Sequence, residues 1–280
     1  MIIVFLLFIM ANFASDIVHL DFFGTNINWS KMEISIKVSE KIPRVIIDNS
    51  DPEYGKDNTA FNLSEARNKT LILAKEKIKI HFARSIESLT LNDEFTIKEA
   101  IEKNLTFRER YNQFFIKESG EFKVRFVQDQ VHLVSSLSLL GTNGLISYLD
   151  IPSSKESFPE FLEKKTFAKY SGLILDARHL DFKPSLFPKI LTDKGLEIYS
   201  AGLIDRNFII NNGLVLYEKD PKKAMLNSRI GQDSNFLVAI NVVGKNKNNL
   251  TITTEDAIKL LSDKSTIDNL KKCKVIILVK

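Results

Sequence analysis

Two pairs of opposite charge in the carboxy-terminal half are the side chains best suited to bind a ligand. Asp176 and Arg178 come directly after the apolar run 172–175, and Asp205 and Arg206 repeat the pairing further along. A carboxylate and a guanidinium at the point where a strand meets a loop can hold a small anionic ligand. The same groups can instead bond to each other's neighbours and fix the loop. We therefore predict Asp176, Arg178 and Arg206 as an interaction or ligand loop, with both interpretations open.

No other spacing in the sequence indicates catalysis. The histidines form neither an HxH nor an HExxH pair, and they stand at His19, His81, His132 and His179. There is no GxSxG, GxxxxGKS/T or GxGxxG motif. The single cysteine, Cys273, can form neither an intramolecular disulfide nor a CxxC zinc pair. The sequence therefore predicts no catalytic, cofactor-binding or metal-binding residues and no enzyme, and a nucleophile–base pair assembled from distant residues stays the alternative.

The first fifteen residues resemble a secretory signal peptide. Residues 1–11 are unbroken apolar sequence, and the first charge is Asp16. This run is shorter than the about 20 residues that span a bilayer, and it fits the apolar core of a leader cleaved near Ala14 or Ser15. A buried first strand is the alternative, because no Lys or Arg precedes the run. We expect an exported protein, and no cysteine follows the run to accept a lipid.

Charge and composition limit the class of partner. The chain has 280 residues, 44% hydrophobic and 26% charged, with a formal net charge of +4. These values are typical of a globular protein and exclude wholesale disorder. The aromatic residues are not interleaved with a basic stripe, so nucleic-acid binding is not expected. Contact with a membrane surface and self-association both stay open.

Local patterns predict an α+β protein built of two small helix-covered sheet modules in tandem. Alternating residues predict strands over 32–38 and 122–126, and a capping box at Asn62 with an apolar stripe predicts a long helix to Leu89. A second helix is expected over 96–111. The polar segment 150–159 is typical of a linker. The predicted units are a leader (1–15), an amino-terminal module (16–150), a linker (151–168) and a carboxy-terminal module (169–280).

The carboxy-terminal module is predicted to be rich in short strands. An apolar strand is expected over 172–178, and a hairpin is expected around the turn 192–195. One central strand is predicted over 236–243, and a buried closing strand over 275–279. A short helix is expected over 161–169.

Two segments of this half resemble a bacterial envelope family. They read Gly172-Leu173-Ile174-Leu175-Asp176-Ala177-Arg178-His179 and Pro184-Ser185-Leu186-Phe187-Pro188-Lys189-Ile190-Leu191-Thr192-Asp193-Lys194-Gly195-Leu196-Glu197-Ile198-Tyr199. This pattern is similar to that of the FlgT and FlgP flagellar proteins and the LPP-twenty outer-membrane lipoproteins. His179 stands where that family usually has glycine, and its lipid-bearing cysteine is absent here. The family pattern contains no catalytic residues.

The resemblance implies a function in the envelope. We expect an exported, non-enzymatic structural or assembly protein, associated with the flagellar motor or its periplasmic ring. Its expected location is the periplasm or the periplasmic face of the outer membrane, and its expected partners are envelope or flagellar basal-body proteins. A soluble periplasmic module that binds a small ligand through Asp176 and Arg178 is the alternative.

Overall fold

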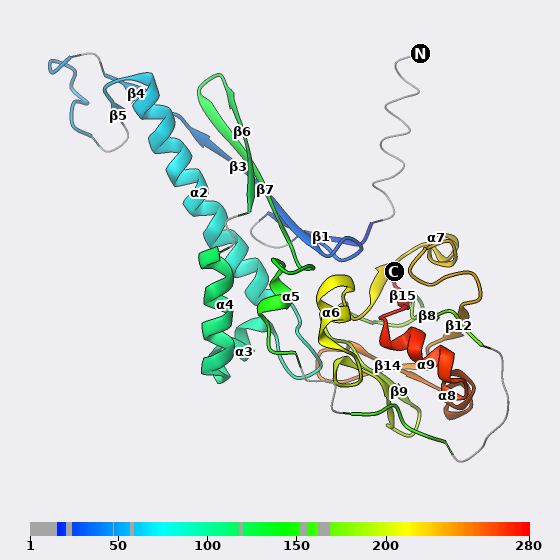
Figure 1. The fold of residues 1–280 in the computed structure, drawn as a ribbon. Coiled ribbons are helices and arrows are strands. Elements are labelled where there is room, and N and C mark those ends of the chain that lie inside the picture. The colour runs from blue at the N-terminus through cyan, green and yellow to red at the C-terminus, as the bar shows by residue number, and fades with distance from the viewer. Residues whose placement is uncertain are drawn as a thin grey trace, which may run out of the picture.

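The protein is α+β, and its described residues form separate sheets in the two halves of the chain. The computed structural model describes residues 16–20, 24–46, 48–56, 59–117, 120–151, 156–161 and 169–280. The predicted leader, most of the predicted linker and most of the helix expected over 161–169 lie outside these residues. Every sheet takes all its strands from one side of residue 150 (Figure 1). The predicted domain boundaries stay a prediction.

The amino-terminal half contains a five-stranded antiparallel sheet in the order β1-β2-β3-β7-β6. Its strands are β1 (Val18–Leu20), β2 (Thr25–Asn28), β3 (Glu33–Lys41), β6 (Glu121–Val127) and β7 (Gln130–Ser138). A further pair of parallel strands, β4 (Arg44–Val45) and β5 (Thr59–Ala60), lies between β3 and the long helix that follows in the sequence. The strand β7 buries every second residue, which is expected when a helix covers one face of the sheet.

The long helix α2 (Leu63–Ser88) covers that face, as its sequence predicts. The Asn62 side chain accepts a hydrogen bond from the Glu65 amide at its start. The buried stripe of the helix includes Ala74, Ile78 and Phe82, which pack in the same apolar core as the sheet. Burying such a stripe is the main source of stability for a helix in a folded protein. We call β1, β2, β3, β6, β7 and α2 together the arm (Figure 1).

The single helix expected over 96–111 is wrong, because the chain forms two helices there. Thr96 and Glu99 make a capping box that begins α3 (Ile97–Lys103). Asn104 ends that helix with an extended backbone, and its side chain then accepts a hydrogen bond from the Phe107 amide in α4 (Leu105–Lys117). A capping side chain in mid-segment therefore separates two helices that share one apolar periodicity. A short helix, α5 (Leu145–Tyr148), follows β7.

The carboxy-terminal half contains two four-stranded sheets. One is parallel, in the order β11-β15-β8-β12, and the other is mixed, in the order β10-β9-β14-β13. The strands are β8 (Leu173–Asp176), β9 (Ile190–Thr192), β10 (Glu197–Tyr199), β11 (Leu216–Glu218), β12 (Asn235–Val238), β13 (Asn241–Val243), β14 (Asn249–Ile252) and β15 (Val275–Leu278). The helices are η1 (Ala201–Leu203), α6 (Arg206–Asn212), α7 (Pro221–Met225), α8 (Thr254–Leu261) and α9 (Lys264–Lys271).

The hairpin around residues 192–195 and the buried closing strand are both confirmed. The single central strand over 236–243 is wrong. The chain leaves the parallel sheet after Val238 and joins the mixed sheet at Asn241, so β12 and β13 are edge strands of different sheets. The two backbone hydrogen bonds at the crossing run from the Ala239 amide to Asp176 and from the Ile240 amide to Thr251. A continuous apolar run does not reveal that its partner strand changes.

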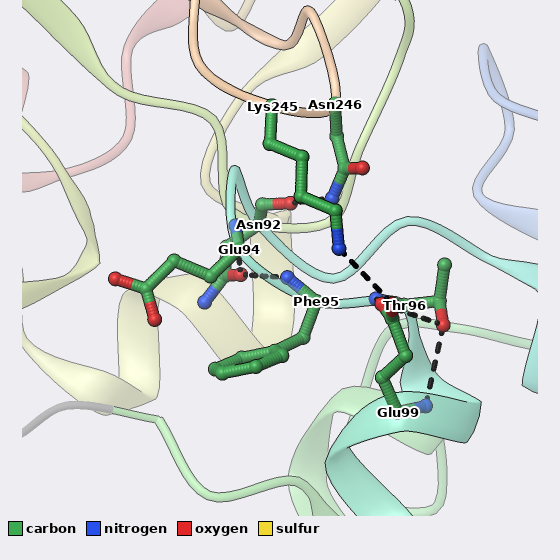
Figure 2. A network of polar contacts seen from close by, with 7 residues as sticks. All are labelled: Asn92, Glu94, Phe95, Thr96, Glu99, Lys245 and Asn246. Carbon is green, nitrogen blue, oxygen red and sulfur yellow. Dashed lines mark hydrogen bonds and ion pairs between the residues drawn. The ribbon is translucent and has the colours of Figure 1, made fainter.

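The two halves contact each other through the loop between α2 and α3. The amides of Leu186 and Phe187 donate to the carbonyl oxygens of Thr90 and Leu91, at 3.0 and 2.8 Å. Figure 2 shows a polar network next to this contact, in which Lys245 and Asn246 reach Glu99 and the Asn92 backbone, at 3.1 and 2.9 Å.

Aromatic side chains join the halves at a second place. The ring of Trp29 meets the ring of Tyr217 edge to face, with centroids 5.8 Å apart. One apolar core therefore runs through both halves. The arm nevertheless extends beyond this contact, away from the carboxy-terminal half (Figure 1).

Candidate functional site

The predicted ligand loop is closed by its own charges. Asp176 ends β8, and Arg178 folds back so that its Nε and Nη2 atoms donate to the two carboxylate oxygens of Asp176, at 2.9 and 2.6 Å. The hydrogen bonds from Arg178 lower the pKa of Asp176, and the same contact raises the pKa of Arg178. The two charges thus pair with each other and not with each other's neighbours.

The third residue of the predicted loop lies elsewhere. Arg206 begins α6, and its guanidinium donates to the carbonyl oxygens of Ser147 and Leu149, at 2.6 and 3.2 Å. It therefore fastens the carboxy-terminal half to α5. Arg206 also borders a polar cavity of about 430 Å³ that neither Asp176 nor Arg178 reaches, lined by Arg110, Gln113, Ser147, Tyr148, Asp150 and Arg206. Arg110 in this cavity is paired with Asp150, at 2.8 Å.

The structure thus divides the predicted residues between two places. Asp176 and Arg178 stay together, and Arg206 is separate from them. Whether either place contacts a ligand or a partner stays a prediction. In the alternative function, a small-ligand module, Asp176 and Arg178 would bind the ligand without Arg206.

One pair of distant residues combines a hydroxyl with an imidazole. Ser39 in β3 and His132 in β7 are direct cross-strand partners, and Ser39 Oγ lies 2.6 Å from His132 Nδ1. Nucleophilic catalysis would also need a group that orients the imidazole and donors for a developing oxyanion. Among the described residues no carboxylate bonds to His132, and neither of the cavities named in this section includes the pair. The geometry is that of a cross-strand polar pair on an open sheet surface.

The charges around this pair form a basic face on the arm. In the register of the sheet, Lys37 and Lys123 flank Val134, and Arg125 lies opposite His132. These side chains alternate with the residues buried under α2, so they point to the uncovered side of the sheet. Val134 is 40% exposed at the centre of this face. No ion pair joins Lys37, Lys123 or Arg125 to another residue of the described part of the chain. The face can therefore attract negative charge.

The edge of the same sheet is an exposed strand, β6. Its burial pattern is exposed at every position except Phe122, which is half-buried. Val124 and Phe126 are 37% and 43% exposed on the side that faces α2. Arg67 and Lys75 of that helix lie over the rings of Phe126 and Phe122, at 5.0 and 5.4 Å from the centroids. This edge thus combines an apolar row with cationic neighbours.

The side of α2 that is turned away from the sheet also carries apolar residues, which lie among lysines in the sequence. Ile72, Leu73 and Ile80 are 50%, 55% and 51% exposed. A groove of about 710 Å³ lies between the first half of α2 and the end of β3. It is lined by Glu40, Lys41, Ile42, Pro43, Arg44, Glu53, Lys69, Thr70, Ile72 and Leu73. Exposed apolar groups beside charges are typical of surfaces that contact other macromolecules. The sequence contains the signal, because these three residues interrupt the polar side of the helix.

Two further observations bear on the kind of site. No group of three or more His, Cys, Asp and Glu side chains that could hold a metal ion is found in the described ranges. No helix among the same residues is long and apolar enough to cross a bilayer.

The carboxy-terminal half also contains a partly buried arginine for which the described residues provide no carboxylate partner. Arg229 donates to the carbonyl oxygens of Cys273, Asn212, Gly213 and Leu214. Burial lowers the pKa of Arg229. Arg229 thus satisfies the carbonyl of the last residue of α6 and those of the two residues after it, and ties them to the loop before β15. Its donors are used within the fold, so its role is structural.

Comparison with known proteins gives a match for one part of the chain. Residues 172–280 match the family described as Treponema pallidum Tp0624, second domain. The match covers the two carboxy-terminal sheets and none of the arm. No curated protein matches the chain. The description of the family mentions no activity, ligand or partner, and it mentions neither flagellar nor LPP-twenty proteins. The resemblance to those proteins therefore stays a prediction.

Proposed function

We propose that the protein is an exported, non-enzymatic structural or assembly protein of the bacterial envelope. The arm is its contact surface. The observation that carries the proposal is that the described residues leave one sheet face, one sheet edge and the outward side of one helix exposed on the same projection. Isolated exposed apolar residues are ordinary on a protein surface, but a concentration of them marks an interaction site.

The remaining parts of the proposal rest on the sequence. The leader-like residues 1–11 support export, and the resemblance to FlgT and FlgP supports association with the flagellar motor or its periplasmic ring. The proposed partners are basal-body or other envelope proteins. A peripheral contact with an anionic membrane surface is a further proposal, which the basic face of the arm favours. Self-association is a separate proposal that this face does not support.

Site-specific photocrosslinking in the native bacterium tests the proposal. A photoreactive phenylalanine replaces Val134 on the basic face or Ile72 on α2, and Leu226 serves as the control. Leu226 is 87% exposed but lies in the carboxy-terminal half. We expect envelope or basal-body proteins to be captured from the two arm positions in the periplasmic fraction. Capture from neither arm position, or an intact leader on protein confined to the cytosol, would refute the proposal.

The flagellar part has its own test. A strain that lacks the gene should lose motility or show incomplete basal bodies in electron cryotomograms. Normal motility with normal motors would refute the flagellar part and leave the envelope part in place.

A further inference from the structure

The strand β6 is a free edge of full length. It pairs with β7 over all seven of its residues, without a register shift, and has no partner on its other side among the described residues. In an antiparallel strand, alternate residues direct their amide and carbonyl groups to each side. Half of the backbone groups of β6 therefore point outward. The opposite edge, β1, has only three residues.

Natural sheet edges are usually protected against pairing. Common devices are proline, a bulge, a short strand and charged side chains. The strand β6 has no proline and no bulge, so its protection against pairing consists of its charged residues. These are Glu121 at its first position and the two cations Lys123 and Arg125. Charge protects an edge only against partners of the same sign. An acidic strand would meet attraction here instead of repulsion.

The two faces of β6 specify different side chains in an incoming strand. On the side of α2, Phe122, Val124 and Phe126 form a row that is open toward the edge. On the other side, Lys123 and Arg125 extend the basic face that begins at Lys37. Directly opposed side chains on paired strands have Cβ atoms about 4.5–5.5 Å apart, which is close enough for charge and apolar contact. A complementary strand therefore alternates apolar and acidic residues.

A second copy of this chain fits the edge poorly. If two β6 strands pair antiparallel over their whole length, Val124 faces Val124, and Lys123 of each copy faces Arg125 of the other. Two like-charge pairs would then lie directly across the new ladder, and such pairs are destabilising. The charge pattern thus favours a different protein over a homodimer.

We propose that β6 binds an extended segment of a partner protein in which apolar and acidic residues alternate. The segment adds a sixth strand to the amino-terminal sheet. Its backbone bonds to the outward groups of β6, its apolar side chains continue the Phe122–Phe126 row, and its carboxylates face Lys123 and Arg125. This inference rests on the proposed function and names the chemistry of the partner.

Peptide binding to the mature protein provides the test. The probe is a fluorescent nonapeptide of alternating valine and glutamate, and fluorescence anisotropy gives its Kd. One control peptide has lysine in place of glutamate. Two further control peptides keep the glutamates but have every second backbone amide N-methylated, one peptide at the odd positions and the other at the even positions. Whichever register the peptide takes, one of the two then lacks the amides that would bond to β6. We expect the glutamate probe to bind but not the lysine peptide or that methylated peptide, and hydrogen exchange to slow at the β6 amides when the probe binds.

Variants of the protein make the test independent of folding. The double variant Lys123→Glu and Arg125→Glu should bind the glutamate probe at least about tenfold more weakly and should gain binding to the lysine peptide. That gain requires a folded edge. The matched control is Lys194→Glu with Lys272→Glu, which makes the same charge change at exposed positions of the carboxy-terminal half.

Three outcomes would overturn the inference. They are equal binding of the methylated peptides, unchanged binding by the β6 double variant, and no binding of the glutamate probe at all. The first would show that charge alone attracts the peptide. Crosslinks from Val134 in cells combined with any of these outcomes would leave the envelope proposal standing and refute only the strand addition. Probe binding without crosslinks in cells would support the strand addition and refute the envelope proposal.

Discussion

Replacing Tyr217 by phenylalanine should destabilise the carboxy-terminal half, at the place where the Tyr217 ring meets Trp29 of the other half. The Tyr217 hydroxyl donates to the carbonyl oxygen of Ser185 at 2.8 Å and accepts from the amide of the same residue at 3.1 Å. Tyr217 and Ser185 are both fully buried, and the Tyr217 ring touches Trp29 from the other half. Burial raises the pKa of Tyr217, so the hydroxyl stays protonated at all ordinary pH values.

The expected loss follows from the two groups that the substitution leaves without a partner. An unsatisfied buried donor or acceptor costs about 1–3 kcal/mol. Water cannot easily replace the hydroxyl, because Tyr217 and Ser185 are both 0% exposed. We therefore expect the free energy of unfolding to fall by about 3 kcal/mol.

The assay is urea unfolding followed by tryptophan fluorescence, since Trp29 is the only tryptophan in the chain. The core is continuous through both halves, so far-UV circular dichroism should change over the same urea range. Tyr54→Phe is the control, because Tyr54 is 45% exposed. A loss below about 0.5 kcal/mol for Tyr217→Phe, equal to that of the control, would refute the reasoning.

Three further predictions concern the carboxy-terminal half. Asp176→Asn should lower the free energy of unfolding by about 1 kcal/mol or less near neutral pH. Because Arg178 lowers the pKa of Asp176 in the folded protein, this stabilisation is present above the unfolded pKa and should vanish as the pH falls through the folded pKa. Equal losses at pH 6 and pH 2 in urea unfolding would contradict this. Cys273 is buried and its pKa is raised to about 11, so a thiol reagent should label it only in denaturant, and rapid labelling of the native protein would count against the structure. Gly244→Ala should destabilise by about 2 kcal/mol, because the residue has φ +91° and its Cβ would lie 2.9 Å from Cβ of Asp93; a neutral effect on urea unfolding would show that the loop can move away.

The elements that the sequence predicted well are those whose signals lie within a few residues. Asn62 and Glu65 mark the start of α2, and the stripe from Ala74 to Ile86 marks its buried side. The same local reading failed at Asn104, where a side-chain cap inside a periodic segment ends one helix and begins the next. It failed again at Ala239, because an apolar run looks the same whether it keeps its partner strand or changes it.

The candidate contact surface was not predicted as a surface. The alternation of Phe122, Val124 and Phe126 indicated a half-buried strand, but not that this strand would lie at the edge of the sheet. The charged pair Asp176–Arg178 is visible in the sequence because its two residues are separated by one position. The partner of Arg206, α5, is more than fifty residues away in the sequence, which no local spacing reveals.

The amino-acid sequence alone determined the α+β class, the covered side of α2 and the lack of a local catalytic motif, because capping and periodicity act between residues one or two turns apart. Only the tertiary structure decided that β3 pairs with β7, 93 residues later at Ser39 and His132, and that β6 is left as the outer strand. Strand order depends on which distant segments exclude the most apolar surface from water together. That choice belongs to the whole chain, and it decides which charges and which backbone groups remain free for a partner.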